Sequence, residues 1–194
     1  VRHYLSAPVA EGPVVVRLDW SRRFDHMQQH TGQHLLTAVA ADRFGWETTA
    51  FHLGPETCDV ELAVPAISTA EASRLEEEVA AEVRAARRVS HRRVDPGEMA
   101  SLPVRTRGLP EGHAGDVRLV EIEGVDLNTC GGTHLGSTAE IEALKLLGTE
   151  KLRGGTRLFF VAGGRVRRRL GAHDDRDAKA RVAGGAAAAG LEDA

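Results

Sequence analysis

The chain has few of the residues that mark several common protein classes. It holds 2 cysteines in 194 residues, too few for a disulfide framework, which favours a reducing, cytoplasmic setting. No apolar run approaches the roughly 18 residues that a membrane span needs. Aromatic residues make up 4%, which argues against a base-stacking platform for single-stranded nucleic acid. The net charge of −3 gives no global signal for nucleic acid, so any RNA contact requires a local basic patch.

The apolar residues are sufficient for a core, and their pattern favours a mixed fold. They make up 42% of a chain the size of one domain, or of one domain with an accessory piece. Helical spacing runs from Asp25, a possible N-cap, to Phe44, and again after a cap at Ser68 or Thr69. Strand patterns occur at 11–20, 46–54, 56–64, 88–94, 117–125 and 157–163. Because the two patterns do not alternate regularly, we expect an α+β fold with helices packed on a mainly antiparallel sheet.

Shorter segments complete the predicted organisation. Residues 96–102 are typical of one helical turn, and 105–116 are rich in Gly, Pro and charge, so we expect a loop there. After the glycines that follow Cys130, the chain leads into a strand or a short helix. Residues 171–194 are rich in Ala, Gly and Asp and have little to bury, so we expect a flexible tail.

Three of the nine histidines recur every fourth residue in HMQQHTGQH, as His26, His30 and His34. A helix turns about 100° per residue, so His30 and His34 share one face. On geometry alone either adjacent pair could grip a metal, or all three could be ordinary helix histidines. The spacing by itself leaves these alternatives open.

A second motif, NTCGGTHLG, supplies further metal ligands. Cys130 and His134 are four residues apart, and the glycines between them let the backbone turn tightly. Added to two helix histidines, they give the His, His, Cys, His composition of a tetrahedral zinc site. Thiolate and imidazole suit zinc, and the lack of carboxylates disfavours magnesium and calcium. The other cysteine, Cys58 in TCDVEL, fits a small core residue of a half-buried strand.

Two zinc families share the histidine spacing but not its catalytic groups. The HExxH metalloproteases need Glu directly after the first His as general base, and Thr31 stands there. The S-ribosylhomocysteine lyases carry an HTxEH-like motif with a distant cysteine, but position 33 is Gln.

A third family matches more closely. RRFDHMQQHTGQHLL, followed about a hundred residues later by VDLNTCGGTHLG, resembles the alanyl-tRNA editing proteins (the AlaX family) and the editing domain of alanyl-tRNA synthetase. The resemblance runs from about Val14 to Gly164 and includes FHLG…CDVEL and GGTRLFFVAGG. It implies a Zn²⁺ site between the first long helix and the CGGTH turn, and it assigns the ligands to His30, His34, Cys130 and His134.

The same resemblance implies a function and a domain organisation. The expected activity is a trans-editing hydrolase that deacylates Ser-tRNA(Ala), Gly-tRNA(Ala) or both, with tRNA(Ala) mischarged with serine or glycine as partner and no membrane partner. An apolar pocket for alanine rejects an added hydroxyl weakly, so a second site is needed for discrimination. The alternative is a non-catalytic RNA-binding module with a structural zinc. Residues 1–20 would be the remnant of an N-terminal β-barrel and 21–170 the zinc-dependent editing domain.

Polar residues near the motifs are candidates for further roles. Gln33 and Thr31 could contact the substrate or the zinc ligands, although Thr31 could equally bond back to its own helical turn. The Gly131 and Gly132 amides could donate to an oxyanion. Candidates for serine selectivity lie on the strand after the helix, at Thr48, Thr49 and His52.

Local basic runs are the candidates for phosphate contacts in an otherwise acidic chain. The runs RAARRVSHRR and GGRVRRRL each read alone as a solvated face. Within the editing hypothesis the second becomes a candidate for the acceptor stem. The predicted tRNA-binding residues are Arg153, Arg165, Arg167, Arg168 and Arg169. His26 has no assigned role beyond a neighbour of the site.

Overall fold

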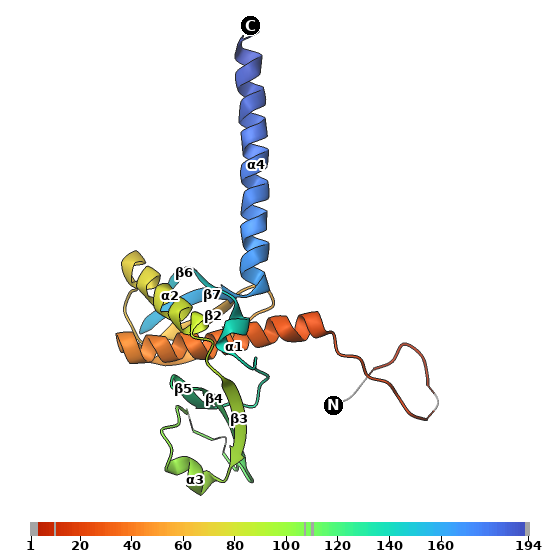
Figure 1. The fold of residues 1–194 in the computed structure, drawn as a ribbon, viewed down its shortest axis with the longest axis vertical. Coiled ribbons are helices and arrows are strands. Elements are labelled where there is room, and N and C mark those ends of the chain that lie inside the picture. Colours follow the sequence, from red (N-terminus) through yellow and green to blue (C-terminus); the bar gives the residue numbers. More distant parts are fainter. Residues whose placement is uncertain (1–3, 10, 107, 110, 193–194) are drawn as a thin grey trace.

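The computed structural model describes residues 4–9, 11–106, 108–109 and 111–192, with side chains to residue 182. Its helices are α1 (Trp20–Phe44), α2 (Thr69–Arg84), α3 (Pro96–Ala100), the 3-10 helix η1 (Thr138–Ile141) and α4 (Gly164–Glu192). Its strands are β1 (Thr48–Leu53), β2 (Cys58–Leu62), β3 (Val89–Val94), β4 (Val117–Ile122), β5 (Asp126–Thr129), β6 (Leu144–Leu152) and β7 (Gly155–Ala162). Figure 1 shows a compact body from which α4 projects as one long helix.

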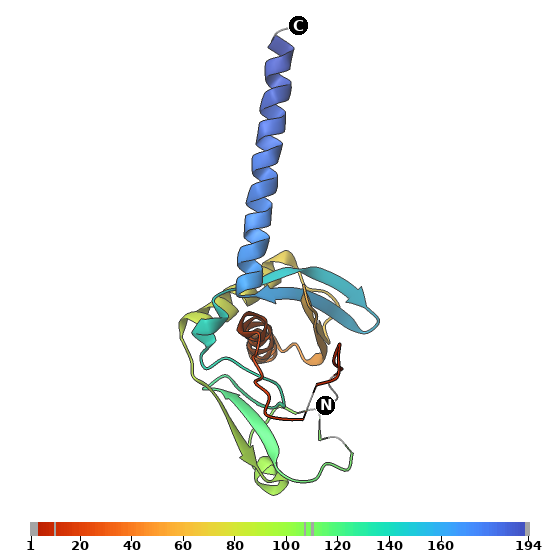
Figure 2. The same cartoon turned by 90° about the vertical axis from the view of Figure 1, so that its right-hand side faces the viewer.

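The strands form two antiparallel sheets, and α1 lies between them. The larger sheet has the order β1-β2-β7-β6 and the smaller β3-β4-β5. The view in Figure 2 looks nearly down α1, with the larger sheet on one side of it and the smaller sheet on the other, and the base of α4 next to α1. The main core joins α1, α2 and the larger sheet, with Leu35, Leu36, Leu75 and Phe160 fully buried. The predicted α+β fold with antiparallel sheets is confirmed.

The first helix starts earlier than predicted. Asp19 caps it, and its carboxylate accepts a hydrogen bond from the Arg22 amide at 3.0 Å, so Asp25 lies inside the helix and is not the cap. The strand predicted over 11–20 is wrong, because residues 11–19 form no strand and are exposed. The helix ends at Gly45, whose φ of 69° is the left-handed geometry expected of a glycine at this position.

The other predicted boundaries are close to those observed. Ser68 and Glu71 form a capping box at the start of α2. The hairpin of β1 and β2 is present, the 96–102 turn is α3, and Cys58 is a core residue with 0% exposure. Residues 138–152 contain both alternatives, a short 3-10 helix and then a strand.

The C-terminal segment forms a helix and not an irregular tail. Residues 171–192 continue α4, and those up to 182 are exposed. Alanine has the highest helix propensity of all residues, which accounts for the helical conformation of this Ala-rich stretch. Its flexibility remains a prediction, as does the division at residues 20 and 170, and residues 1–3, 10, 193 and 194 lie outside the described residues.

Buried polar side chains fix α1 to the larger sheet, to η1 and to the start of α4. The Gln29 amide donates to the Ala162 carbonyl at 3.0 Å and accepts from its amide at 2.8 Å. Gln28 donates to the Glu140 carbonyl at 2.9 Å and accepts from the Gly164 amide at 3.1 Å. Both glutamines are almost fully buried, and satisfied buried amides fix one orientation of a helix. The histidine face of α1 is thereby held in one position.

An ion pair at the start of α1 yields a stability prediction. Asp25 pairs with buried Arg165 at 2.7 Å and with Arg168 at 3.0 Å. Burial opposes ionisation, but the hydrogen bonds from both arginines lower the pKa of Asp25 below its ordinary 3.8. We expect Asp25→Asn to cost about 2 kcal/mol of unfolding free energy at pH 7.

The pH dependence of that loss follows from the lowered pKa. The wild-type pair contributes fully above pH 3.8 and is lost as the pH falls through the folded-state value. The difference in unfolding free energy between the wild type and Asp25→Asn should therefore disappear in strong acid, as measured by urea unfolding at several pH values. Asp174→Asn, on the exposed part of α4, is the control. An unchanged gap at all pH values would contradict the assignment.

Candidate metal site

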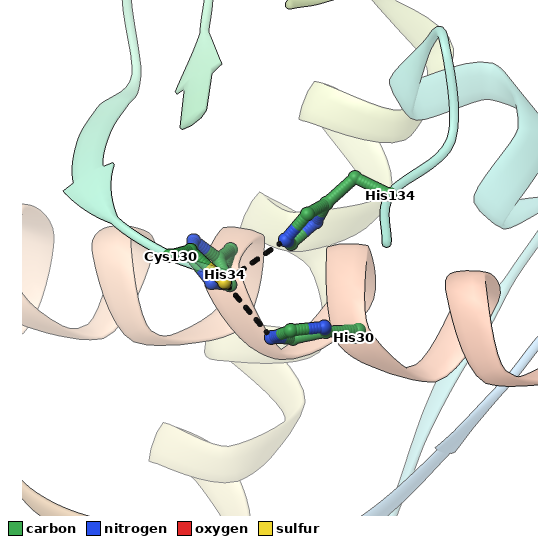
Figure 3. Close-up of side chains that lie close together, drawn as sticks. All are labelled: His30, His34, Cys130 and His134. Carbon is green, nitrogen blue, oxygen red and sulfur yellow. Dashed lines mark hydrogen bonds between the residues drawn. The ribbon is translucent and has the colours of Figure 1, made fainter. Parts of the chain in front are cut away.

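Four side chains from two distant segments meet beside α1. His30 and His34 project from one face of the helix, and Cys130 and His134 come from the loop between β5 and η1 (Figure 3). Cys130 Sγ lies 3.4 Å from His30 Nε2 and 3.3 Å from His134 Nε2. One ligand atom from each of the four lies within 4.8 Å of the others, so the group could hold a metal ion.

These separations fit a tetrahedral site. Zinc binds sulfur at about 2.3 Å and imidazole nitrogen at about 2.0–2.1 Å, which puts sulfur and nitrogen about 3.5 Å apart in a tetrahedron. The two sulfur–nitrogen distances of 3.4 and 3.3 Å are close to that value. His26 does not belong to the group, so the structure selects the second of the two histidine pairs.

A buried carboxylate orients His34. Asp126 Oδ2 lies 3.1 Å from His34 Nδ1, and both side chains are at most 5% exposed. Arg105 faces the other oxygen of Asp126 at 3.1 Å and reaches Asp42 on α1 at 2.6 Å. A metal-binding imidazole commonly donates its second N–H to a carboxylate, which leaves Nε2 to face the ion. This arrangement was not predicted, because nothing in the sequence singles out Asp126 among 28 acidic residues.

Thr31 anchors the loop that carries His134. Its side chain is 0% exposed, and its hydroxyl accepts from the Leu135 amide at 3.1 Å and lies 3.2 Å from His134 Nδ1. The Thr31 hydroxyl therefore contacts His134, a member of the cluster, as one predicted alternative has it. It makes no hydrogen bond back to the described residues of its own helical turn, which is the other alternative.

The CGGTH turn is held from within and from the neighbouring strand. The Arg118 guanidinium donates to the carbonyls of Cys130 and Gly132 at 2.7 and 2.8 Å. The Gly132 amide donates a hydrogen bond to Cys130 Sγ at 3.3 Å, so this N–H is already engaged and is not free to bind an oxyanion. The Gly131 amide makes no hydrogen bond to any described residue and is the freer of the two predicted oxyanion donors.

Electrostatics within the cluster favour a thiolate. Burial opposes ionisation, but hydrogen bonds from His134, His30 and His34 lower the pKa of Cys130 to about 3. Burial also lowers the pKa of His134 to about 4, aided by its histidine neighbours. For His34 the burial effect is outweighed by hydrogen bonds to Asp126 and Cys130, which raise its pKa to about 9. Metal binding needs the thiolate that this environment provides and would release the proton of His34.

A cavity of about 440 Å³ opens directly beside the cluster, lined by Cys130 and His34. Gln33 and Thr48 also line it. The Gln33 Oε1 and Thr48 Oγ1 atoms are buried, and neither has a hydrogen-bond partner within the described part of the chain. Buried polar atoms without a partner are costly, so each is a ready contact for a polar ligand group.

The other two selectivity candidates lie elsewhere. Thr49 is exposed and its hydroxyl donates to the Glu61 carbonyl at 3.3 Å. His52 is exposed and pairs with Asp59 at 2.9 Å. Neither lines the cavity. Strand β1 is irregular between Thr48 and Ala50, so the alternation shifts there and Phe51, not His52, lines the cavity with Thr48. A second His and acidic group, His52, Asp59 and Glu61, has both carboxylates paired with Arg157.

The predicted tRNA-binding arginines differ in exposure. Arg165 is 3% exposed, and besides its pair with Asp25 it donates to the Gly54 carbonyl at 2.8 Å, so it is part of the fold. The side chains of Arg167 and Arg168 are 69% and 68% exposed, although each has an acidic partner. Arg169, which donates to Thr57, and Arg153 in the β6–β7 turn are also exposed.

None of the described helices combines the length and the apolar character that crossing a membrane requires.

Comparison with known proteins identifies relatives of this site. The profile of the family described as Threonyl and Alanyl tRNA synthetase second additional domain matches residues 117–159, which include Cys130 and His134. The alanyl-tRNA editing protein Aarsd1 of Danio rerio is 44% identical over 166 residues, or 84% of this chain and 40% of that protein. Aarsd1 of Rattus norvegicus is 45% identical over the same shares. This chain resembles the alanyl-tRNA editing proteins, as its motifs predict.

The likeness extends to synthetases. An alanine–tRNA ligase of Ignicoccus hospitalis is 38% identical over 173 residues, which cover 84% of this chain and 19% of the ligase. This chain spans about 40% of the length of the Aarsd1 relatives.

Proposed function

We propose that this chain is a zinc-dependent hydrolase that cleaves the ester between serine or glycine and tRNA(Ala). The observation that carries the proposal is the convergence of His30, His34, Cys130 and His134 beside a cavity with unpaired polar atoms. The relatives named as alanyl-tRNA editing proteins support it. The metal identity follows from the donor set, since one thiolate and three imidazoles favour zinc over oxygen-preferring cations.

The chain's own groups would prepare the reaction. A zinc ion, when bound, supplies a Lewis acid for the ester carbonyl or for a water molecule. Asp126 and Thr31 hold His34 and His134 in place, and Arg118 holds the backbone of the CGGTH turn. The Gly131 amide is positioned in the same turn as a donor for negative charge on the carbonyl oxygen.

Serine recognition is assigned to Thr48 and Gln33. A serine hydroxyl can both donate and accept. Thr48 and Gln33 line the same cavity as Cys130, and their Oγ1 and Oε1 atoms are buried without a partner among the described residues. A site that hydrogen-bonds a substrate hydroxyl discriminates better than an apolar pocket, because its polar groups are left unpaired with the wrong substrate.

Thr48→Val tests this assignment while preserving side-chain shape. We expect kcat/KM for Ser-tRNA(Ala) to fall about tenfold, the effect of one lost hydrogen bond, while that for Gly-tRNA(Ala) changes little. Thr49→Val, on the opposite side of the same strand, is the matched control. Equal losses on both substrates, or equal losses from both variants, would refute the selectivity role.

Contacts to the body of the tRNA are assigned to the exposed arginines at the root of α4. Arg168 and Arg169 line a groove of about 300 Å³ with Pro55, and Arg167 is exposed beside them. Exposed guanidinium groups suit phosphate contacts. Arg165 supports this surface indirectly, by fixing the start of α4 to Asp25.

The alternative function is RNA binding without catalysis, with a structural zinc. The observation that favours it is the number of ligands, because four protein ligands are typical of a closed zinc site, whereas catalytic sites keep one position open. A panel of Ala-, Ser- and Gly-tRNA(Ala) with purified protein separates the two. Release of serine or glycine without release of alanine supports hydrolysis. If tRNA binds and all three esters persist at micromolar protein, the hydrolase proposal fails.

A further inference from the structure

A second groove, separate from the 440 Å³ cavity, borders the cluster at His134. It encloses about 280 Å³ between the start of α1, strands β3 and β4, and the loop of the CGGTH turn. His134 lines this groove, whereas Cys130 and His34 line the cavity. The four-residue cluster therefore borders two separate hollows through different members.

The groove has the charge of an anion site. Arg23, His91 and Arg118 line it, and no acidic residue is among its lining residues. The side chains of Arg23 and His91 have no ion-pair or hydrogen-bond partner within the described chain, and the Arg118 guanidinium donates only to backbone carbonyls.

Strand register extends this basic surface beyond the groove. Arg93 on β3 lies directly opposite Arg118 on β4, so the two side chains share one face with His91, two residues away. Like charges directly across an antiparallel pair are destabilising. Arg93 is exposed and has no acidic partner among the described residues. A fold that keeps two facing arginines without a carboxylate is suited to an external anion.

An aromatic ring stands at the mouth of the groove. Trp20 lines it and is 62% exposed, and its ring is 6.3 Å from that of Phe24. An exposed indole beside guanidinium groups is the combination that binds single-stranded nucleic acid, because the ring stacks on a base while the cations contact phosphates. The 4% aromatic content argues against a base-stacking platform for single-stranded nucleic acid, and Trp20 is the one aromatic ring among the lining residues besides the histidines.

We propose that this groove binds the single-stranded 3′ end of the RNA, with Trp20 stacked on a base and Arg23 and Arg93 on phosphates. The inference rests on the proposed function, because it places the nucleotides on the His134 side of the cluster while the aminoacyl group occupies the Thr48 cavity. The ester would then lie over the metal ligands. Double-stranded RNA does not fit this reading, because its bases are already stacked.

Binding of an uncharged RNA tests the groove independently of hydrolysis. The probe is a fluorescent single-stranded oligonucleotide ending in CCA, and the variants are Trp20→Ala, Trp20→Phe and the double change Arg23→Gln with Arg93→Gln. Trp20→Ala should raise Kd about tenfold, and Trp20→Phe should restore most of the affinity. The double variant should reduce the salt slope of log Kd by about 1.4. Arg176→Gln, on the exposed part of α4, is the single-charge control.

The outcomes separate this inference from the proposed function. If the variants weaken oligonucleotide binding and raise KM for Ser-tRNA(Ala) with kcat unchanged, both stand. If the variants weaken oligonucleotide binding but the wild type cleaves no mischarged tRNA, the groove stands and the hydrolase proposal fails. If folded Trp20→Ala and the double variant bind the oligonucleotide as the wild type does, or if a blunt RNA duplex binds equally well, the groove assignment is overturned.

Discussion

Gly132→Ala is expected to abolish metal binding and deacylation although it adds only one methyl group. A Cβ at position 132 would lie 2.2 Å from Cε1 and 2.5 Å from Nδ1 of the His30 ring, far inside contact distance. The ring can escape only by swinging away, and that movement takes its Nε2 away from Cys130. We expect zinc affinity to fall at least about 100-fold, the upper range for displaced ligand support. Activity should fall in parallel.

The neighbouring glycine provides a matched control for this variant. A Cβ at Gly131 would meet nothing within 4 Å, and its backbone is not in the left-handed region. Gly131→Ala should therefore keep one zinc per chain and wild-type affinity in a chelator competition assay. If both alanine variants bind zinc equally well, the His30 contact does not shape the site. If both variants lose zinc binding, the substitutions act by disrupting the turn itself and not through the contact with His30.

Cys130→Ala is expected to have the second large effect. The thiolate contacts both His30 and His134 and is the only anionic ligand of the cluster. Structural zinc sites are worth about 10–16 kcal/mol over four ligands, so one lost ligand should reduce affinity by about 100-fold or more. The deacylation rate should drop with zinc occupancy. Metal content by elemental analysis and Ser-tRNA(Ala) hydrolysis are the two measurements.

The second cysteine separates a metal role from a general packing role. Cys58 is fully buried in β2, so Cys58→Ala should reduce stability moderately and leave the zinc content unchanged. The thermal midpoint of wild type and Cys58→Ala should fall when zinc is chelated, whereas that of Cys130→Ala should not respond. A Cys130→Ala protein with full zinc and full activity would contradict the assignment of the ligand.

The cluster could be predicted from two short motifs together with a family resemblance. Spacing puts either adjacent histidine pair on one helix face, and two glycines allow Cys130 and His134 to converge. The resemblance to the alanyl-tRNA editing proteins then selects His30 and His34. The supporting residues could not be predicted, because their roles depend on pairings across the fold. Asp126 becomes a partner of His34 only when β5 packs against α1. Arg118 meets the CGGTH turn through the register of β4.

The errors in the predicted fold have equally local causes. A run of valines before Asp19 has high β propensity, but no described strand pairs with it, and a strand is stable only with a partner. The flexible tail predicted after residue 170 stays a prediction, and its helical conformation, which the sequence pattern does not predict, follows from the high helix propensity of alanine. Arg165 belongs to a basic run by sequence, yet tertiary packing buries it against Asp25.

The most direct test of the account is zinc occupancy measured together with Ser-tRNA(Ala) hydrolysis in one preparation. Zinc is removed stepwise with a chelator and then restored. The account predicts one zinc per chain at saturation and a deacylation rate proportional to the occupied fraction, lost and regained with the metal. A zinc-free protein that cleaves the ester at the full rate, or a fully loaded protein that leaves it intact, would contradict it.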